Sequence, residues 1–373
     1  MIVDGPELRI GGRPVGPGAP CLIAAEAGSA HGGELGRGLE LVDAAAEAGA
    51  DAVKFQIIFA DEIVHPRTGT IRLPGGETPI YERFKALERD RAFFEALKER
   101  AEKRGLLFFA SVFGPRSARM LRSLNPPAVK IASPELNHFP LLAEVGGWGL
   151  PVILSTGVST LGDIERALAY CPKAVLLHCL TAYPAPEAQY NLRLLESLRA
   201  VFGRPTGVSD HSLDPLLVPA LSAALGGCLV EKHLTLKRRG GGLDDPIALE
   251  PPAFAGMVRG IRELERAGPR EALAVLKERY GRERVEEVLG DGVKRLAPAE
   301  AGFYESTRRS LHAAGDIEAG ERITAERLCI VRSERNLRPG LGPEHLGQVL
   351  GAAAARRIPD GEGIRWEDLL LRG

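Results

Sequence analysis

Short apolar runs alternate with amphipathic stretches along residues 20–266 of the chain. The runs have the length and composition of strands, and the stretches between them repeat apolar positions at helical spacing. One predicted helix, 161–170, is preceded by a residue that favours helix capping, Thr160. The predicted strands lie at 21–28, 51–56, 106–113, 128–133, 151–156, 174–180, 205–210 and 227–235. The chain is therefore predicted to be built of consecutive βα units.

Eight βα units within about 250 residues match the size of a TIM barrel, which closes its parallel strands into a cylinder. A doubly wound open sheet is the nearest alternative, but its usual GxGxxG after the first strand is missing, and eight near-equal units favour closure. The stretch 57–90 is the long interruption of the repeat, and we expect it to lie as a loop or lid on the catalytic face. These features predict an α/β fold with a (β/α)8 barrel domain at 1–268.

The pattern changes after residue 268. The segment 269–290 is dense in charged residues at helical spacing, which is typical of a solvated helix or two between domains. We therefore assign 269–304 to a helical insertion or linker. Short strands and turns follow, which predicts a small β-rich domain at 305–373.

Composition excludes several classes of function. Net charge is −1, with 45% apolar and 26% charged residues, so nothing favours binding to nucleic acid or to a membrane surface. The five cysteines are scattered without a CxxC pair, which is typical of free thiols in a reducing compartment. No signal peptide is visible at the start, and no apolar run approaches the ~20 residues of a membrane span. We expect a cytoplasmic protein.

Two similar segments, GVSDHSL and CLVEKHLTL, end the seventh and eighth predicted strands with His211 and His233. In a barrel, the carboxyl ends of neighbouring strands meet at one rim, so these histidines are expected side by side. Two imidazoles can share a divalent metal and leave positions open for water or a substrate oxygen. An isolated histidine is more often a packing residue, but the repeated context favours the metal. Candidates for holding the non-ligating ring nitrogens are Asp210, Glu231 and Glu26.

Lysines and hydroxyls gather at the other strand ends. Lys54 closes the second strand and Lys130 lies in the fourth. A lone lysine in a strand usually reaches outward to solvent, but two in apolar runs suggest an anion site for phosphate or carboxylate. The accompanying hydroxyls are those of Ser111, Ser133, Ser155, Thr156, Thr181 and Ser209. Groups suited to reading sugar hydroxyls are Gln56, Glu135, Tyr183 and Asp244. The residues thus predict a phosphate-bearing substrate, a divalent metal and a polar second substrate.

Seven ordered motifs resemble those of the sialic acid synthase (NeuB) family: AAEAGSAHGG, AGADAVKFQ, KIASPEL, PVILSTGVSTL, HCLTAYPAP, GVSDHSL and VEKHLTL. The tail, RRSLHAAGDIEAGERIT with LRPG, is similar to the family's antifreeze-like SAF domain, a β-clip fold. The resemblance implies that phosphoenolpyruvate (PEP) condenses with an N-acetylmannosamine-type aldose. The products would be phosphate and a nine-carbon 2-keto sugar acid, N-acetylneuraminate or a related nonulosonic acid. Mn²⁺ or Mg²⁺ would polarise the aldehyde.

The resemblance also implies roles for individual residues, matched motif by motif. Lys54 and Lys130 would take part in catalysis. Glu26 or Glu231 could serve in proton transfer, and the sequence leaves the choice between these two carboxyl groups open. PEP would be bound by Lys54, Ser111, Lys130, Ser133, Ser155, Thr181 and Ser209. Sugar contacts would come from Gln56, Glu135, Tyr183, Asp244 and Arg338, and metal ligands from His211 and His233. In the family the arginine matched by Arg338 enters the partner subunit's site, which implies a domain-swapped homodimer.

Departures from the family pattern concern the sugar more than the PEP half of the site. Ala30 replaces an asparagine, Thr181 replaces asparagine or serine, and GGLD replaces PGPD before Asp244. Inserted residues make Arg338, rather than Arg332, a choice by motif. Alternative products are pseudaminic or legionaminic acid, made from a 2,4-diacetamido-trideoxy hexose, or a spore-coat or surface-polysaccharide sugar. A Schiff-base aldolase using Lys130 and a non-catalytic carbohydrate-binding homologue also remain open.

Overall fold

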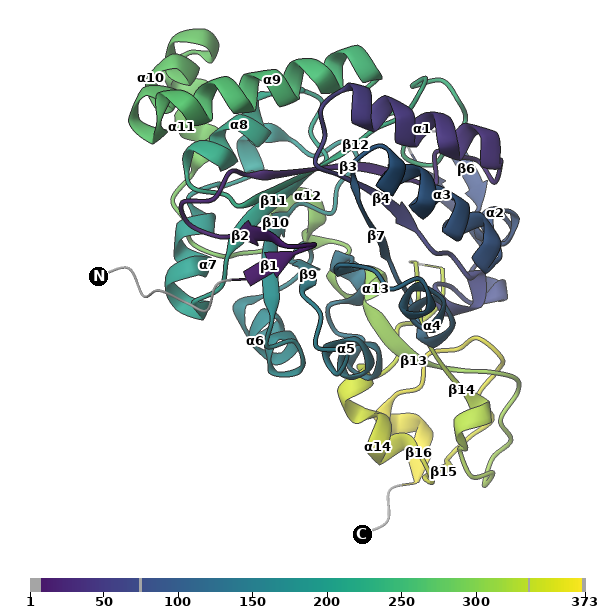
Figure 1. Ribbon diagram of the computed structural model, residues 1–373. Coiled ribbons are helices and arrows are strands. Elements are labelled where there is room, and N and C mark those ends of the chain that lie inside the picture. The colour runs from purple at the N-terminus through teal and green to yellow at the C-terminus, as the bar shows by residue number, and fades with distance from the viewer. Residues whose placement is uncertain (1–7, 74–75, 335, 371–373) are drawn as a thin grey trace.

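The computed structural model describes residues 8–73, 76–334 and 336–370; the outer ends of the predicted first and last domains, 1–7 and 371–373, lie outside them. Within this described part, all eight predicted strands form one closed parallel barrel (Figure 1). The strands are β3 (Leu22–Gly28), β4 (Ala52–Gln56), β7 (Leu107–Ser111), β8 (Val129–Ile131), β9 (Val152–Ser155), β10 (Ala174–Cys179), β11 (Thr206–Asp210) and β12 (Leu229–His233). Closure comes from β12 pairing with β3, in register from Leu229 against Leu22. The TIM barrel prediction is confirmed.

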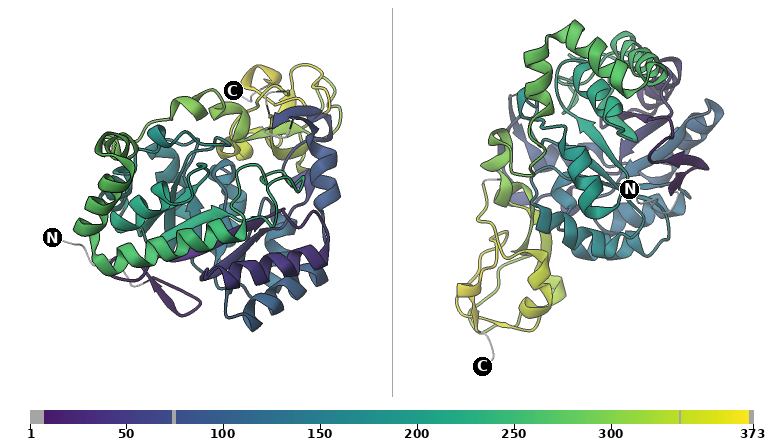
Figure 2. Two further views of the ribbon diagram at one scale, coloured as in Figure 1. Left: turned by 90° about the horizontal axis from the view of Figure 1, so that it is seen from above. Right: turned by 90° about the vertical axis from the view of Figure 1, so that its left-hand side faces the viewer.

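Helices surround the barrel, as Figures 1 and 2 show. They are α1 (Leu35–Glu47), α3 (Arg91–Lys103), α4 (Pro115–Ser123), α5 (Phe139–Gly146), α6 (Leu161–Tyr170), α7 (Leu194–Phe202), α8 (Leu217–Ala224) and α9 (Pro251–Ala267). The predicted cap of α6 is confirmed, because the Thr160 side chain accepts from the Asp163 amide and the Asp163 carboxylate accepts from the Thr160 amide. The βα alternation in the sequence therefore becomes a strand cylinder inside a helical layer.

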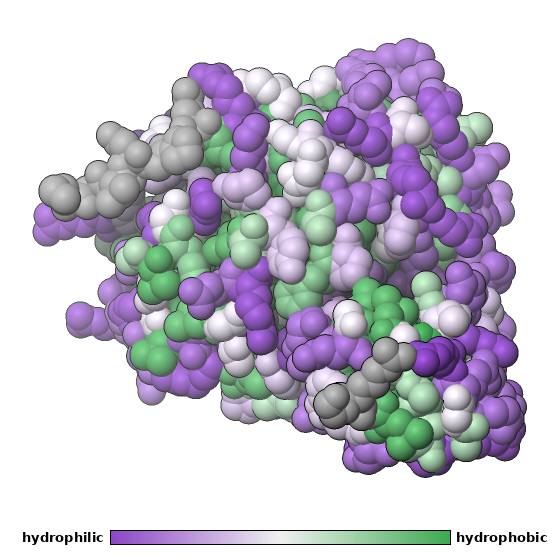
Figure 3. Space-filling model, turned by 90° about the horizontal axis from the view of Figure 1, so that it is seen from below, coloured by the Kyte–Doolittle hydropathy of each residue, from purple (hydrophilic) through white to green (hydrophobic). Residues whose placement is uncertain are grey.

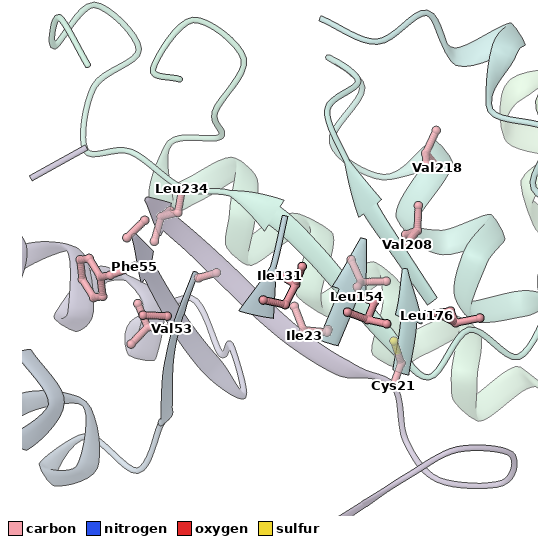
Figure 4. Packing of buried hydrophobic residues seen from close by; sticks show 14 of the residues in the cluster. Cys21, Ile23, Val53, Phe55, Ile131, Leu154, Leu176, Val208, Val218 and Leu234 are labelled. Carbon is pink, nitrogen blue, oxygen red and sulfur yellow. The ribbon is translucent and has the colours of Figure 1, made fainter. Parts of the chain in front are cut away.

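Alternation along each strand separates the core from the site. Val53 and Phe55 of β4 belong to the apolar cluster between strands and helices (Figure 4). Because successive side chains point to opposite faces, Lys54 between them points into the barrel. The same alternation explains how buried strands carry lysine and carboxylate side chains without interrupting the outer core.

A hairpin that the sequence did not reveal, β1 (Leu8–Ile10) and β2 (Arg13–Val15), covers the amino-terminal end of the barrel. Ile10 and Val15 are buried against apolar residues of the barrel interior. Gly11 makes the turn possible, since its φ is +56° and a Cβ there would lie 2.3 Å from the Leu107 side chain. Because the hairpin closes the amino-terminal end of the barrel, a site is expected at the carboxyl ends of the strands.

The long interruption after β4 forms a compact insertion on the carboxyl side of the barrel, as predicted. It comprises η1 (Ala60–Glu62), η2 (Pro66–Thr68), the hairpin β5 (Thr70–Leu73) and β6 (Gly76–Pro79), and α2 (Ile80–Leu87). Its own apolar cluster includes Ile63, Val64 and Ile80. The insertion therefore has a packed base, and its hairpin extends over the cavity described below.

The predicted linker contains helices α10 (Pro269–Tyr280), α11 (Arg282–Leu289) and α12 (Pro298–Ala301), followed by α13 (Tyr304–Thr307). They are less solvated than their charge density suggests. Leu276, Val285 and Val288 are buried in the main apolar cluster of the barrel. The expectation of simply solvated helices is therefore wrong, because one face of each of α10 and α11 is packed.

The C-terminal domain is small and β-rich, as predicted, and its pairs are β13 (Arg309–Ala313) with β14 (Leu328–Arg332) and β15 (Ala353–Ala354) with β16 (Leu369–Leu370). Short helices η5 (Ala325–Arg327), η6 (Pro343–His345), α14 (Leu346–Val349) and η7 (Trp366–Asp368) connect them. The domain projects from one side of the barrel (Figure 2). It contacts the insertion through the Arg332 amide on the Ile63 carbonyl and the Asn336 side chain on the Thr68 and Thr70 carbonyls.

The surface agrees with the composition. Figure 3 shows polar residues around the edge of the face seen from below, with smaller groups of apolar residues between them. None of the helices in the described part of the chain is long and apolar enough to cross a membrane.

Candidate active site

The carboxyl ends of the barrel strands open into a cavity of about 650 Å³. The predicted site residues all lie in the described part of the chain, and those that do not line this cavity are Glu135, Arg338, Thr156 and Asp210. The ones that line it are Glu26, Lys54, Gln56, Ser111, Lys130, Ser133, Ser155, Thr181, Tyr183, Ser209, His211, Glu231, His233 and Asp244. The structure therefore brings together, from strands far apart in sequence, nearly the whole predicted set.

Lys54 lies at the floor of the cavity within a buried ionic cluster. Its Nζ donates to Ser111 Oγ at 2.8 Å and lies 2.9 Å from Glu26 Oε2 and 3.6 Å from Glu231 Oε1. Burial disfavours the ammonium form, but the carboxylates of Glu231 and Glu26 outweigh it and raise the pKa of Lys54. Lys54 is thus a fixed positive charge facing the cavity.

The other lysine has a different environment. Lys130 Nζ lies 3.6 Å from Glu231 Oε1, and burial lowers the pKa of Lys130 although that carboxylate opposes the shift. Glu231 also accepts from Ser209 Oγ at 2.9 Å. Burial alone would raise the pKa of Glu231, but Lys130 and Lys54 more than offset it, so its pKa is lowered. Glu231 is therefore held ionised.

Glu26 differs from Glu231 although both are buried near Lys54. Burial raises the pKa of Glu26, and the charge of Glu231 adds to this while Lys54 opposes it. Gln56 Nε2 donates to Glu26 Oε1 at 2.8 Å. Two neighbouring carboxyl groups with opposite pKa shifts have different proton affinities, which suits them to different roles.

A cradle of hydroxyls lies at the ends of β8, β9 and β10. Ser133 Oγ accepts from the Gly157 amide at 3.0 Å, and a Cβ at Gly157 would lie 2.4 Å from Thr181 Oγ1. Only glycine therefore lets the chain approach these hydroxyls. Ser155 Oγ and Thr181 Oγ1 are buried without a hydrogen-bond partner in the described part of the chain. Unpartnered buried hydroxyls facing a cavity are available to an anionic ligand.

The linker supports this cradle in a way that the sequence analysis missed. Glu300 of α12, itself buried, accepts from the amides of Val158 at 3.1 Å and Thr181 at 2.8 Å. Lys294 Nζ donates to the Thr156 carbonyl at 3.0 Å. In the sequence both residues belong to the predicted linker, 269–304, and no local signal distinguished them as supports of a site.

The histidine pair lies at the ends of β11 and β12, next to the hydroxyl cradle, because β11 pairs with β10. The ring centroids of His211 and His233 are 5.5 Å apart, and Tyr183 stacks on His211 at 4.2 Å. His211 Nδ1 lies 2.7 Å from the Leu180 carbonyl oxygen. Since a carbonyl only accepts, Nδ1 carries the proton and Nε2 keeps its lone pair.

The prediction that Asp210 holds a histidine ring nitrogen is wrong. Asp210 Oδ2 lies 2.5 Å from Lys232 Nζ in a fully buried ion pair behind the site. The other two candidates are engaged with the lysine cluster, as described above. A backbone carbonyl, which sequence reasoning does not register as a ligand-orienting group, fills that role instead.

The histidine pair fits a divalent cation of the exchangeable, catalytic kind. Burial lowers the pKa of His211 to about 4 and that of His233 well below its ordinary value, so both rings are neutral and can donate lone pairs. No cluster of three or more potential ligands occurs among the described residues. The protein would thus supply two nitrogens, and water and substrate oxygens the remaining positions.

Asp244, from the loop after β12, lies close to this pair, with Oδ2 4.0 Å from His233 Nδ1. Burial, followed by the charge of Glu26, raises the pKa of Asp244 to about 7. Glu135 is elsewhere: it is fully buried between Arg309 and Arg332 of the C-terminal domain. Of these two arginines, Arg332 also lines the cavity.

Arg338 is held within the C-terminal domain by ion pairs to Glu362, Glu367 and Asp368. The sequence motif favoured Arg338 over Arg332 as the residue that reaches a site, whereas in its own chain Arg332 is the one at the cavity. Its predicted entry into a partner subunit stays a prediction.

Known proteins resemble this chain over nearly its whole length. The NeuB family model matches residues 41–271 and the SAF domain model residues 308–370. The spore coat polysaccharide biosynthesis protein SpsE of Bacillus subtilis is 33% identical over 98% of each chain. N,N'-diacetyllegionaminic acid synthase of Legionella pneumophila is 32% identical over 98% of this chain and 99% of its own. The crystal structure of SpsE superposes with a TM-score of 0.82, covering 98% of this chain and all of that one. The chain therefore belongs to the NeuB family and carries a C-terminal SAF domain.

Proposed function

We propose that this protein is a transferase that condenses PEP with an N-acetylmannosamine-type aldose, giving phosphate and a nine-carbon 2-keto sugar acid such as N-acetylneuraminate. The observation that carries the proposal is that one cavity holds two kinds of functional group. Lys54, Lys130 and the hydroxyl cradle offer an anion site, and His211 and His233 offer neutral nitrogen ligands.

The lysines and hydroxyls form the anion site that would bind PEP. Two buried ammonium groups suit its carboxylate and phosphate, and Ser111, Ser133, Ser155, Thr181 and Ser209 supply hydroxyl donors around them. Such donors are arranged before the substrate arrives, so little reorganisation is needed during the reaction.

The histidine pair and the residues near it would bind the aldose and activate its aldehyde. When bound, Mn²⁺ or Mg²⁺ supplies a Lewis acid for the aldehyde oxygen. Tyr183, Gln56 and Asp244 line this part of the cavity and would contact the sugar hydroxyls. We retain Glu135 and Arg338 as proposed sugar contacts that a second subunit or a domain movement would have to bring to the site.

The bond changes then follow from the residues. Carbon 3 of PEP bonds to the aldehyde carbon, water adds to carbon 2, and cleavage of the carbon 2–oxygen bond releases phosphate. Ionised Glu231 stabilises positive charge developing at carbon 2. Glu26 has the higher proton affinity of the two carboxyl groups, so it is the better group to take a proton from the water and pass it to the new hydroxyl.

A 2,4-diacetamido-trideoxy hexose is the second candidate substrate, giving legionaminic or pseudaminic acid. It is favoured by the relative named N,N'-diacetyllegionaminic acid synthase. The Schiff-base alternative has one observation in its favour, the lowered pKa of Lys130. Trapping a borohydride-stable adduct on Lys130 would replace the PEP mechanism, which forms no imine.

The test is phosphate release from PEP in the presence of N-acetylmannosamine or 2,4-diacetamido-2,4,6-trideoxy sugars, each with Mn²⁺ and with a chelator. Metal-dependent release with one of these sugars supports the proposal and identifies the sugar. A folded, metal-loaded protein that releases no phosphate with any of them contradicts it.

A further inference from the structure

A second cavity, of about 410 Å³, adjoins the mouth of the main one. Glu77 and Leu243 line both cavities, so the two share a wall. The second cavity lies between the insertion and the loop after β12, which Arg83 connects by donating from Nη2 to the Gly241 carbonyl. Leu243 precedes Asp244, so this cavity opens on the side of the site assigned to the aldose.

The second cavity is positively charged. Its lining contains three arginines, Arg83, Arg238 and Arg239, against one carboxylate, Glu77. In the part of the chain that the structure describes, none of these guanidinium groups forms an ion pair with a carboxylate. Arg238 donates from Nε to the Pro246 carbonyl at 3.2 Å, but a guanidinium carries five N–H donors, so most remain free for a ligand.

Three arginines exceed what a carboxylate requires, since a single guanidinium binds a carboxylate through two parallel hydrogen bonds. A phosphomonoester carries a charge of about −1.5 to −2 and three acceptor oxygens, which matches the excess of donors better. The carboxylate and phosphate of PEP already have partners in the lysines and hydroxyls of the main cavity. The second anion site therefore belongs to the other substrate.

We propose that the aldose carries a phosphomonoester at the end remote from its aldehyde, and that Arg83, Arg238 and Arg239 bind this group. The proposal rests on the proposed function and specifies its substrate class. The aldehyde is placed near His211 and His233, and the sugar extends past Asp244 and Leu243 toward the arginine cavity. A 6-deoxy hexose has no oxygen on carbon 6 to carry the phosphate, so the substrate is N-acetylmannosamine 6-phosphate or a sugar like it.

The experiment compares N-acetylmannosamine with its 6-phosphate as partners for PEP, following phosphate release with Mn²⁺ present. We expect kcat/KM to be at least about tenfold higher for the phosphorylated sugar, because hydrogen bonds to charged groups contribute strongly to binding. Arg83→Gln and Arg239→Gln should each lower kcat/KM about tenfold for the 6-phosphate while changing it less than about threefold for the neutral sugar. Arg259→Gln, which removes an exposed arginine that lines neither cavity, is the matched control and should behave as wild type.

The outcomes separate this proposal from the proposed function. Equal kcat/KM values for the two sugars, or variants that weaken both equally, overturn the arginine subsite and leave the condensation intact. If neither sugar reacts, calorimetric titration with N-acetylmannosamine 6-phosphate in the presence of PEP decides. Binding lost in Arg83→Gln and Arg239→Gln but kept in Arg259→Gln supports the subsite, and unchanged binding overturns it. Inorganic phosphate that binds as tightly as the sugar phosphate indicates a free-phosphate site and overturns the substrate assignment.

Discussion

Replacing Glu135 by glutamine distinguishes two roles for this residue. By motif, Glu135 is expected to contact the sugar; in the structure it is fully buried between Arg309 and Arg332 and joins the C-terminal domain to the barrel. Removing one partner of a buried ion pair typically costs about 3–5 kcal/mol, because a buried charge is left uncompensated. With an unfolding entropy of about 2.1 cal/mol/K per residue, this corresponds to a fall in Tm of about 4–6 °C if both domains unfold together.

The stability difference between wild type and Glu135→Gln should also depend on pH. Burial would raise the pKa of Glu135, but Arg309 and Arg332 lower it below its ordinary value of 4.5. A carboxyl group whose pKa is lower in the folded state stabilises the fold above its unfolded pKa and loses that contribution as pH falls through the folded pKa. The difference in Tm is therefore largest at neutral pH and shrinks below pH 4.5.

The assay is calorimetric unfolding from neutral to acidic pH, with aldose KM measured in parallel. Glu95→Gln is the control, because it breaks an exposed Arg91–Glu95 pair on α3 that should contribute at most about 1 kcal/mol. An unchanged Tm in Glu135→Gln together with a raised aldose KM would refute the anchoring role and restore the sugar contact.

Four further predictions concern the site and the assembly of subunits. His211→Ala and His233→Ala should each lower kcat by at least about a thousandfold with an unchanged circular dichroism spectrum, because the Lewis acid is lost; near-normal turnover in either would exclude the shared metal. Glu300→Ala should raise the KM for PEP at least about tenfold and the KM for the aldose by less, because two backbone amides lose their acceptor. Glu300→Gln should restore most of the lost PEP affinity. Equal changes in both KM values would point to a general structural effect. Arg338→Ala should raise the aldose KM more than the PEP KM; equal effects on both would place this arginine elsewhere. Deletion of 306–373 should break or weaken the dimer if the homodimer is domain-swapped. Light scattering should then give a mass below that of two shortened chains, and a mass equal to two shortened chains would refute the swap.

Much of the site could be predicted from the sequence, because in a barrel the position of a residue along its strand fixes where that residue lies in space. Once eight strands are recognised, the residue at each strand end must lie on one rim, so Lys54, Lys130, His211 and His233 are brought together without knowledge of any contact. Resemblance to a family added the assignment of chemistry to those positions.

Contacts between segments far apart in sequence were not accessible in this way. Glu300 and Lys294 lie in the predicted linker, yet the folded chain brings them into contact with the loops after β10 and β9. Hydrogen bonds to backbone groups, such as those of Glu300 and that of His211 to the Leu180 carbonyl, cannot be predicted from residue types, because every residue has a backbone. The opposite pKa shifts of Glu26 and Glu231 likewise depend on their distances from Lys54 and Lys130.

The sequence by itself determined the barrel, the small C-terminal domain and the inventory of reactive groups, because periodicity and strand-end position are local properties. Only the tertiary structure decided which of these groups share the cavity, that Glu135 anchors a domain, and that three arginines from the insertion and the loop after β12 meet in one place. The physical reason is that such choices depend on how long loops and domains pack against one another, and non-local packing is not encoded in any single stretch of residues.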